Sequence, residues 1–307
     1  MVESTTVAIP ARGWRLPTGR PYKVAIVTDS SASLPPDAGR LGPLFVAPLQ
    51  LVLDGRTYLD GVDMTPAEFY RRQSAFGGTT TTSAPTPNSF QQAFTRALEV
   101  ADSVLCLTVS PNFSATHAAA IAGLQAAADG MEHPLPISIV DTESAAGGEG
   151  LVVTAALRAA AAGAGLEEVT FVARNVTGRV HLVAYLDTLY YVWKSGRVPV
   201  VAHWGTSVLQ IKPIFEMRRG AVKSLARVRS ARGAAEKLLD LVRKRIEGPL
   251  HATVMHANAP EMALSVTEVL RSSFEVRELY VSEFSPVMGS HTGPGLVGIA
   301  YWCEERQ

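Results

Sequence analysis

The chain contains very little cysteine. Among its 307 residues only Cys106 and Cys303 are cysteines, and they do not form a Cys-x-x-Cys pair. A cysteine metal site or redox pair is therefore not expected. Cys106 lies in the apolar run 104–107, which is typical of a buried strand. The low cysteine content also fits a reducing cytosol, so we expect a cytoplasmic protein.

An excess of charge of either sign is also missing. Lys and Arg total 28, and Asp and Glu total 28, so the formal net charge is zero. A nucleic-acid partner is not expected, because such proteins normally carry a basic excess or stripe. The densest basic stretch covers residues 218–232. Such a run usually forms a solvated face, and the alternative is a docking surface for an acidic partner.

Long apolar runs are absent as well. No stretch of about 18 apolar residues is free of charge, and the richest, residues 151–166, contains Arg158. The N-terminus has no apolar signal core, because Arg12, Arg15 and Arg20 interrupt it. We therefore expect no integral membrane segment, and we interpret residues 1–21 as a loose N-terminal tail.

Several catalytic and cofactor motifs are missing too. Neither G-x-G-x-x-G nor G-x-x-x-x-G-K-[ST] follows the first predicted strand, and G-x-S-x-G does not occur. His251 and His256 lie five residues apart, which is not a metal-binding spacing on a strand. A serine, His291 and an Asp could be combined into a catalytic triad. Such combinations are easy to find in a chain with seven histidines, so they are weak evidence. We expect no catalytic residues, no metal and no cofactor.

The remaining pattern is that of a two-domain α/β protein, since 307 residues exceed the usual size of one core. In the first half, predicted strands alternate with helices, which favours a mainly parallel sheet flanked by helices. These strands are 23–28, 44–52, 104–109 and 137–140, and the helices are 88–101, 115–128 and 148–163. The second half is predicted to contain strands at 180–184, 209–216, 221–225, 251–256 and 276–281. We place the N-terminal α/β domain at 22–165 and the C-terminal α/β domain at 166–307.

Short hydroxyl side chains gather at the carboxyl ends of the predicted strands, where open parallel sheets bind ligands. They are Thr28 and Ser30 beside Asp29, then Thr82 and Ser83 in a predicted loop at 79–87, then Ser110 and Ser114. Capping of the following helices is the simpler explanation of each loop. Ser110 and Ser114 precede a predicted helix, whose free N–H groups favour an anion. With so little positive charge nearby, the set favours one carboxylate and an apolar slot for its body.

The segment 287–295 is the most unusual part of the chain. It places His291 among Gly289, Gly293 and Gly295, which predicts a glycine-rich turn in which backbone can approach a ligand closely. A purely structural histidine is the alternative to a ligand-facing one.

These segments together resemble the DegV family over residues 23 to 303. The matching family motifs are T-D-S at 28–30, T-S-Q-P-S-P at 82–87, S-S-G-L-S-G-T at 110–116, V-D-[ST]-x-S-A at 140–145, L-D-T-L-E-Y-L from 186, G-R-I from 196, I-K-P from 211 and G-x-H-x-G-P-G at 289–295. The chain departs from them with Ala84 in place of Gln, and with Pro111, Asn112 and Ala115 in the 110–116 loop.

The resemblance implies two α/β domains that hold a long-chain fatty acid in a slot between them. Some members are the acyl-binding subunit of bacterial fatty acid kinase, and present the acid to a separate ATP-dependent subunit. By this resemblance, Thr82 and either Ser110 or Ser114 hold the carboxylate, with His291 beside it. The expected ligand-binding set also includes Thr28, Asp29, Ser30, Ser83 and Thr116. The chain is then a carrier and not an enzyme. The alternatives are a stand-alone serine esterase or thioesterase, and a lipid transport or sensing protein without a kinase partner.

Overall fold

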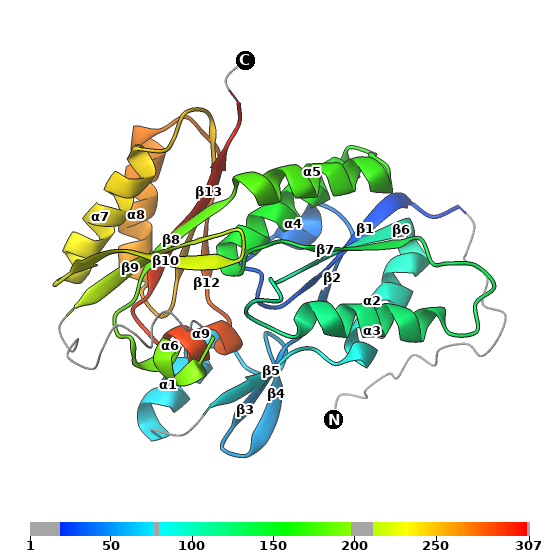
Figure 1. Cartoon of the computed structure of the whole chain (residues 1–307), viewed down its shortest axis with the longest axis horizontal. Helices are drawn as coiled ribbons and strands as arrows, with labels where there is room; N and C mark the ends of the chain where they lie inside the picture. The colour runs from blue at the N-terminus through cyan, green and yellow to red at the C-terminus, as the bar shows by residue number, and fades with distance from the viewer. Residues whose placement is uncertain (1–18, 77–79, 198–210, 306–307) are drawn as a thin grey trace.

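The computed structural model describes residues 19–76, 80–197 and 211–305, and Figure 1 shows how their helices and strands are arranged. Most of the predicted tail, residues 1–18, lies outside this part of the chain, as does the start of the strand predicted at 209–216. The described residues form two larger sheets and one small sheet, with helices packed against them. The predicted α/β class is confirmed.

The first sheet is entirely parallel and has the strand order β2-β1-β6-β7. Its strands are β1 (Tyr22–Asp29), β2 (Leu44–Ala47), β6 (Ala101–Thr108) and β7 (Ile137–Asp141). β1 and β6 are buried along most of their length, as expected of strands covered by helices on both faces. The parallel sheet predicted from the alternation of strands and helices is confirmed.

Two pairs of helices cover this sheet, one pair on each face (Figure 1). They are α2 (Pro87–Val100) with α3 (Thr116–Ala128), and α4 (Ala146–Ala161) with α5 (Leu166–Arg179). Phe90 and Phe94 of α2 pack in one core cluster with Val27 and Cys106. The α2 helix begins as its sequence predicts: the Thr86 side chain accepts a hydrogen bond from the Ser89 amide, and a proline follows the cap.

The second sheet has six strands in the order β10-β9-β8-β13-β11-β12, and only β11 and β12 are parallel. The strands are β8 (His181–Tyr185), β9 (Lys212–Arg218), β10 (Ala221–Val228), β11 (Leu250–His256), β12 (Val276–Glu283) and β13 (Val297–Cys303). Helices α7 (Ala231–Arg243) and α8 (Pro260–Ser273) pack on one face. The α4 helix packs on the other face.

Helix α4 therefore lies between the two larger sheets and contributes to a core that both share. Its first turn is rich in glycine because there is no room for side chains: a Cβ on Gly147 would lie 2.5 Å from the Met255 sulfur. Arg158 near its end forms an ion pair with Glu278 of β12, with N and O 2.7 Å apart. The predicted domain boundary at 165–166 falls at the start of α5, which packs against α4.

The third sheet is small and antiparallel, with the order β4-β3-β5. Its strands are β3 (Gln50–Leu53), β4 (Arg56–Leu59) and β5 (Thr81–Ser83). Near it lie the helices α1 (Pro66–Phe76), α6 (Tyr190–Ser195) and α9 (Pro286–Thr292), and α9 contacts α1, α6 and β3. The 3-10 turn η1 (Ala38–Arg40) precedes β2. The small sheet thus brings segments from both halves of the chain together.

Three local predictions were wrong. The single strand predicted at 44–52 is two strands in different sheets, because Pro48 between them has no N–H to continue a ladder. The loop predicted at 79–87 contains β5, which pairs with β3. The glycine-rich turn predicted at 287–295 contains helix α9. Ser285 caps it by accepting from the Met288 amide, and Pro286 occupies its first turn.

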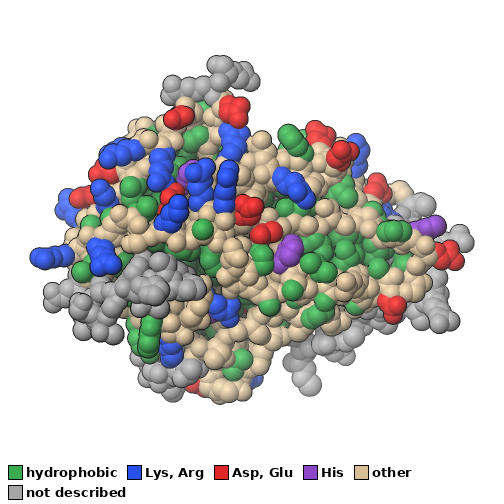
Figure 2. Space-filling model, viewed as in Figure 1, with side chains coloured by type: hydrophobic (Ala, Val, Ile, Leu, Met, Phe, Trp, Pro, Cys, Tyr) green, Lys and Arg blue, Asp and Glu red, His purple; other side chains and the backbone are tan. Residues whose placement is uncertain are grey.

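The basic run at 218–232 is exposed, as a solvated face requires. It runs from the end of β9 along β10, an edge strand of the six-stranded sheet, into the first turn of α7. Its exposed members are Arg218, Arg219, Lys223, Arg227, Arg229 and Arg232. Figure 2 shows Lys and Arg side chains gathered on this side of the molecule. Charged side chains on an edge strand hinder pairing with a strand of another chain.

Candidate functional site

A pocket lies where the three sheets meet, with walls from both halves of the chain. Its empty space amounts to about 930 Å³, part of it open to solvent. Much of the wall is apolar and includes Val109, Phe113, Leu186, Phe215, Met217 and Met288. A pocket with this lining suits a small molecule with a large apolar part.

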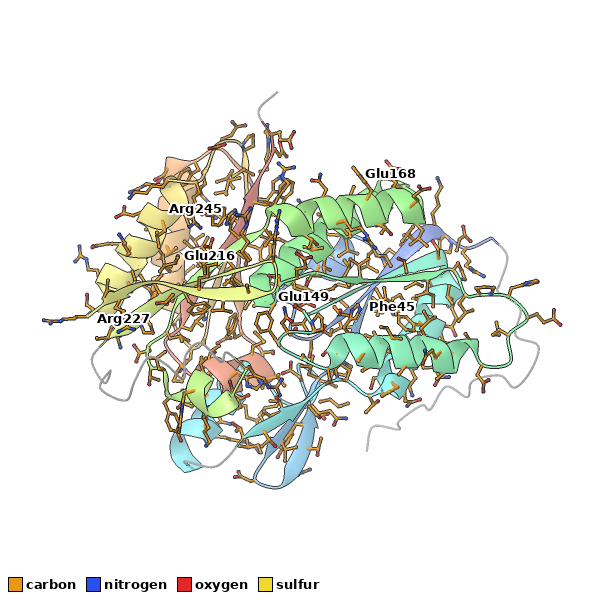
Figure 3. The ribbon with its side chains drawn as sticks, viewed as in Figure 1. Phe45, Glu149, Glu168, Glu216, Arg227 and Arg245 are labelled. Carbon is orange, nitrogen blue, oxygen red and sulfur yellow. The ribbon has the colours of Figure 1, made fainter. Side chains whose placement is uncertain are left out.

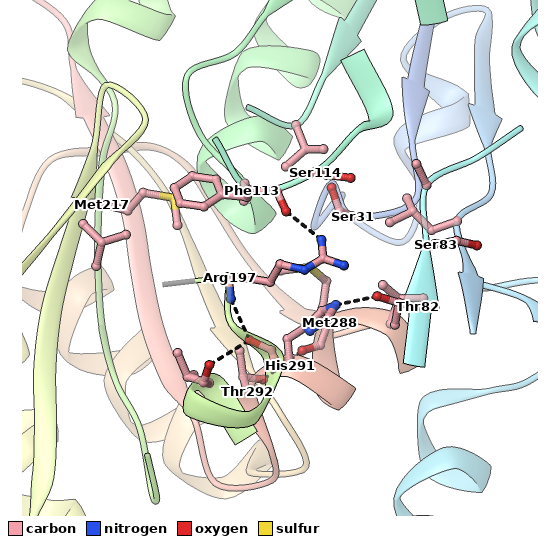
Figure 4. A pocket seen from close by; sticks show the side chains of 18 of the residues that line it. Ser31, Thr82, Ser83, Phe113, Ser114, Arg197, Met217, Met288, His291 and Thr292 are labelled. Carbon is pink, nitrogen blue, oxygen red and sulfur yellow. Dashed lines mark hydrogen bonds between the residues drawn. The ribbon is translucent and has the colours of Figure 1, made fainter. Parts of the chain in front are cut away.

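The polar side chains of the pocket gather in one region (Figure 4). Thr82 Oγ1 and His291 Nε2 lie 2.8 Å apart in a hydrogen bond. The Arg197 guanidinium points into the same region and donates from Nη1 to the Phe113 carbonyl at 2.8 Å. Ser114 lies beside them in the same view. A guanidinium, two hydroxyls and an imidazole at one end of an apolar pocket can hold a single anionic head group.

Local structure fixes each of these side chains. Thr82 is the middle residue of β5, where it pairs with Leu51 of β3. Ser114 Oγ accepts from the Thr116 amide at 3.3 Å at the start of α3, so this serine serves helix and pocket together. Arg197 follows Gly196, which ends α6 in a left-handed conformation with φ of 64°.

His291 is held in the last turn of α9. The first turn of this helix is anchored by Asp60, whose carboxylate accepts from the Val287 amide at 3.0 Å. The middle of α9 is packed tightly, because a Cβ on Gly289 would lie 2.4 Å from the Tyr70 hydroxyl oxygen. The histidine therefore belongs to a fixed helix and not to a flexible turn.

Burial lowers the pKa of His291 to about 4, and the positive charge of Arg197 adds to this effect. At neutral pH the imidazole is therefore uncharged and can donate and accept one hydrogen bond each. The hydrogen bond of its Nε2 atom is made with Thr82 Oγ1. The positive charge of the site at neutral pH comes from Arg197.

The low pKa of His291 predicts an acid-sensitive fold. Its pKa is about 4 in the folded chain and about 6.5 when unfolded. Between these values only the unfolded chain gains a proton, so stability should fall by about 3 kcal/mol as the pH drops from 6.5 to 4. His291→Gln should lose less stability over this range, measured by urea unfolding at several pH values. The exposed His133→Gln should behave as wild type, and an equal acid loss in His291→Gln would contradict the prediction.

The other residues predicted for the site lie near the pocket but do not all face it. Ser83 lines the wall, and its hydroxyl also donates to Gln50 at 3.1 Å. Ser110 and Thr116 are fully buried, and neither is among the residues that line the pocket. Ser110 is the less suitable of the two candidate serines, because only Ser114 lines the wall.

The first predicted loop, residues 28–30, lies behind the pocket. Thr28 Oγ1 donates to Glu149 at 3.3 Å, and Ser30 Oγ donates to Asp60 at 2.7 Å. The Asp29 carboxylate accepts from the Val109 amide at 2.9 Å. None of these three predicted residues lines the wall. Their contacts hold the loops that carry the pocket residues.

A buried pair of carboxyl groups adjoins the pocket. Ser31, which lines the wall, has its Oγ 2.6 Å from an Asp29 oxygen and 2.9 Å from a Glu149 oxygen. One hydroxyl hydrogen cannot serve two carboxylates, so one of the two acids must be protonated. Burial raises the pKa of both, and that of Glu149 well above its ordinary value. Glu149 is the protonated partner, since Asp29 accepts from two backbone amides.

Sequence reasoning missed Glu149, Ser31 and Arg197 as parts of this site. Glu149 lies in the first turn of α4, between the two larger sheets (Figure 3). The sequence feature that could have indicated Glu149 is an acidic residue among glycines and apolar residues in the run 145–157. Arg197 could have been predicted as a site residue, because it is the arginine of the G-R-I motif.

Comparison with known proteins supports one family. The family model described as "Uncharacterised protein, DegV family" matches residues 23–304. The chain belongs to the DegV family. A DegV domain-containing protein of Streptomyces coelicolor is 32% identical over 282 residues, which cover 90% of this chain and 97% of the relative.

Solved DegV structures share the fold. A fatty-acid-binding DegV family protein from Thermus thermophilus has a TM-score of 0.83 and 30% identity, over 92% of this chain and all of the other. A protein from Thermotoga maritima with a fatty acid binding function has a TM-score of 0.79 and 28% identity, over 92% and 100% of the two chains. DegV from Bacillus subtilis, also a fatty acid binding protein, has a TM-score of 0.80 and 25% identity, with 92% and 100% covered.

In this DegV chain the described residues give no serine–histidine pair at the predicted loop. Ser114 contacts Thr116, and Ser110 bonds the Asn112 amide, so neither hydroxyl meets a histidine there. Within the same ranges, no three His, Cys, Asp or Glu side chains are grouped to hold a metal ion. No helix of the described chain is both long and apolar enough to span a bilayer.

Proposed function

We propose that this DegV protein binds one long-chain fatty acid, with its carboxylate at Arg197, Thr82, Ser114 and His291 and its tail in the apolar part of the pocket. The observation that carries this proposal is the division of the pocket. One end has a cation and hydroxyls, and the remaining wall is largely apolar. A fatty acid has the same division between a single charge and a long apolar chain.

The energies favour such a ligand. Burial of each CH₂ contributes about 0.8 kcal/mol, so about fourteen methylenes contribute roughly 11 kcal/mol before entropy and desolvation costs. The carboxylate adds little net binding energy unless donors replace its water. Arg197 uses one of its N–H groups on the Phe113 carbonyl and retains others for the ligand. Thr82 and Ser114 supply hydroxyls from two other elements.

Removal of the lipid provides the direct test. The delipidated protein should be stabilised by acids of about 14 to 18 carbons, a length that a slot between two α/β domains can enclose. At a ligand concentration of 100 times Kd, stability should rise by about 2.7 kcal/mol, which raises Tm by roughly 4 °C for a chain of this length. The methyl ester of the same acid is the matched control and should stabilise less, since it has no charge. The absence of stabilisation by every such acid would overturn the proposal.

We further propose that the chain presents the carboxylate to a separate ATP-dependent kinase subunit. Two observations support this role. Neither G-x-G-x-x-G nor G-x-x-x-x-G-K-[ST] follows the first strand, where nucleotide sites carry their phosphate loop, and Thr82, Arg197 and His291 also line a second cavity beyond the pocket. The chain would then be the acyl-binding part of a two-component system.

Reconstitution distinguishes this role from its alternatives. Acyl phosphate should form from ATP and the loaded protein only when the cognate kinase subunit is added. Product formed by this chain alone would show that it is itself an enzyme. Lipid bound with no product in the presence of a competent kinase would favour transport or sensing.

A further inference from the structure

The hairpin of β9 and β10 carries part of the pocket wall toward the other half of the chain. Phe215, Met217 and Val222 of this hairpin line the pocket. Figure 1 shows the hairpin reaching from the six-stranded sheet toward the loops that follow β6 and β7. β10 is an edge strand, and within the described chain it pairs only with β9. The position of this wall therefore depends on contacts at the tip of the hairpin.

The tip is a two-residue turn formed by Arg219 and Gly220, whose φ angles are 50° and 68°. Turn residues normally lie at the surface, but Gly220 is buried. Its amide donates to the Glu143 carbonyl at 2.6 Å, and its carbonyl accepts from Asn112 Nδ2 at 3.0 Å. There is no room for a side chain here, because a Cβ on Gly220 would lie 2.7 Å from Asn112 Nδ2. Both backbone groups of Gly220 are thus held by loops of the parallel sheet.

The same two loops carry the opposite wall of the pocket. Phe113 directly follows Asn112 and lines the pocket. Ala145, two positions after Glu143, lines it as well. Asn112, Glu143 and Gly220 are not lining residues, so they form a latch that joins the two walls from outside the ligand space. The motif at 110–116 has glycine where this chain has Asn112, so the side-chain part of the latch is not encoded by the motif.

We infer that this latch controls lipid exchange, so that the acyl chain enters and leaves the pocket only while the latch is open. The inference rests on the proposed function, because it requires a lipid in the pocket. A chain of about 14 to 18 carbons cannot pass between walls in contact, so one wall has to move. The hairpin is the wall that moves most easily, because the two hydrogen bonds of the latch can break without loss of any pairing within a sheet.

Such a latch affects rates and not affinity. It has to open for entry and for exit, so weakening it raises both rate constants by the same factor. Kd is their ratio, and it stays the same while the closed state remains the main one. A residue that stabilises the bound lipid would instead change Kd together with the release rate.

The test measures two quantities on the full chain. Transfer of radiolabelled hexadecanoate from the loaded protein to excess albumin gives the release rate. Isothermal titration gives Kd, and the release rate divided by Kd gives the association rate.

Two variants weaken the latch, and each has a matched control. Asn112→Ala removes the donor to Gly220, and Gly220→Ala places a methyl group against Asn112. Asn88→Ala is the control for the first, because Asn88 is exposed on α2 and does not line the pocket. Gly55→Ala is the control for the second. Gly55 occupies the same turn position in the hairpin of β3 and β4, with φ of 73°, and a Cβ there meets no atom within 4 Å.

Asn112→Ala should raise the release rate and the association rate about fivefold each, as loss of one hydrogen bond requires, and should leave Kd within about twofold of wild type. Gly220→Ala should accelerate both at least as much, because its methyl group also obstructs closure. Both controls should exchange lipid as wild type does. Asn112 is exposed, so its truncation should leave the fold intact, which urea unfolding checks.

Two results would overturn the inference. One is release at the wild-type rate in either latch variant. The other is faster release with an equal rise in Kd, since the latch residues would then stabilise the bound lipid. Failure of wild type to bind hexadecanoate would instead overturn the proposed function, and the inference with it.

Discussion

Arg197→Met should weaken the binding of hexadecanoate by about 10- to 100-fold. A hydrogen bond to a charged group contributes about 1.5–3 kcal/mol, and each 1.4 kcal/mol is a factor of ten in Kd. Methionine keeps much of the apolar stem of the side chain while removing the charge. Arg197 is the cation of the pocket wall, since His291 is neutral at pH 7 with a pKa of about 4.

Stability and a matched variant separate this effect from misfolding. Arg197 donates to the Phe113 carbonyl at 2.8 Å, so its loss should cost at most about 1 kcal/mol of folding free energy. Arg174 lies on the exposed side of α5, so Arg174→Met should change neither the folding stability nor the affinity for hexadecanoate. Isothermal titration with hexadecanoate and its methyl ester should show the loss for the acid only. An unchanged affinity for the acid would place the carboxylate elsewhere.

The buried carboxyl pair predicts opposite results for two substitutions. Asp29→Ala should destabilise the fold by about 3 kcal/mol or more, because the amides of Ser31 and Val109 lose their acceptor in a buried place. Glu149→Gln should be neutral or stabilising. Glutamine has the same shape as the protonated acid, and it cannot acquire a charge that burial disfavours.

The pH dependence tests which acid holds the proton. The pKa of Glu149 is raised in the folded chain, so the folded form keeps a proton that the unfolded form loses above about pH 4.3. The stability from this group is fully present below that pH and is lost as the pH rises through the folded pKa. The free energy of unfolding of Glu149→Gln, measured in urea, should therefore rise relative to that of wild type between pH 5 and pH 8. A variant that is much less stable than wild type at both values would show that Glu149 is ionised in the native state.

The fold class could be derived from the sequence because its signals are local. Residues 24–27 of β1 form an apolar run that ends at Thr28 and Asp29, and such a run indicates a strand buried on both faces. The Thr-Pro pair at 86–87 predicts the start of α2 through cap geometry alone. The ordered family motifs then predicted that Thr82, either Ser110 or Ser114, and His291 contact the ligand. Of these, Thr82, Ser114 and His291 line the pocket.

The arrangement of the site was decided by contacts between distant segments, which no local pattern encodes. Thr82 and His291 are 209 positions apart, and meet because β5 pairs with β3 and α9 packs beside that strand. The glycines around His291 indicated a turn, but the Ser285 cap, Asp60 and Tyr70 favour a helix there.

The sequence by itself determined an α/β chain without excess charge, whose strand ends carry hydroxyls suited to one carboxylate. Local propensity, caps and apolar periodicity were sufficient for that. The tertiary structure decided which of those hydroxyls face the pocket, that Arg197 enters it, and that Glu149 lies buried behind Ser31. These features depend on burial and on neighbours far away in sequence, because the energy of a charge is set by what surrounds it after folding.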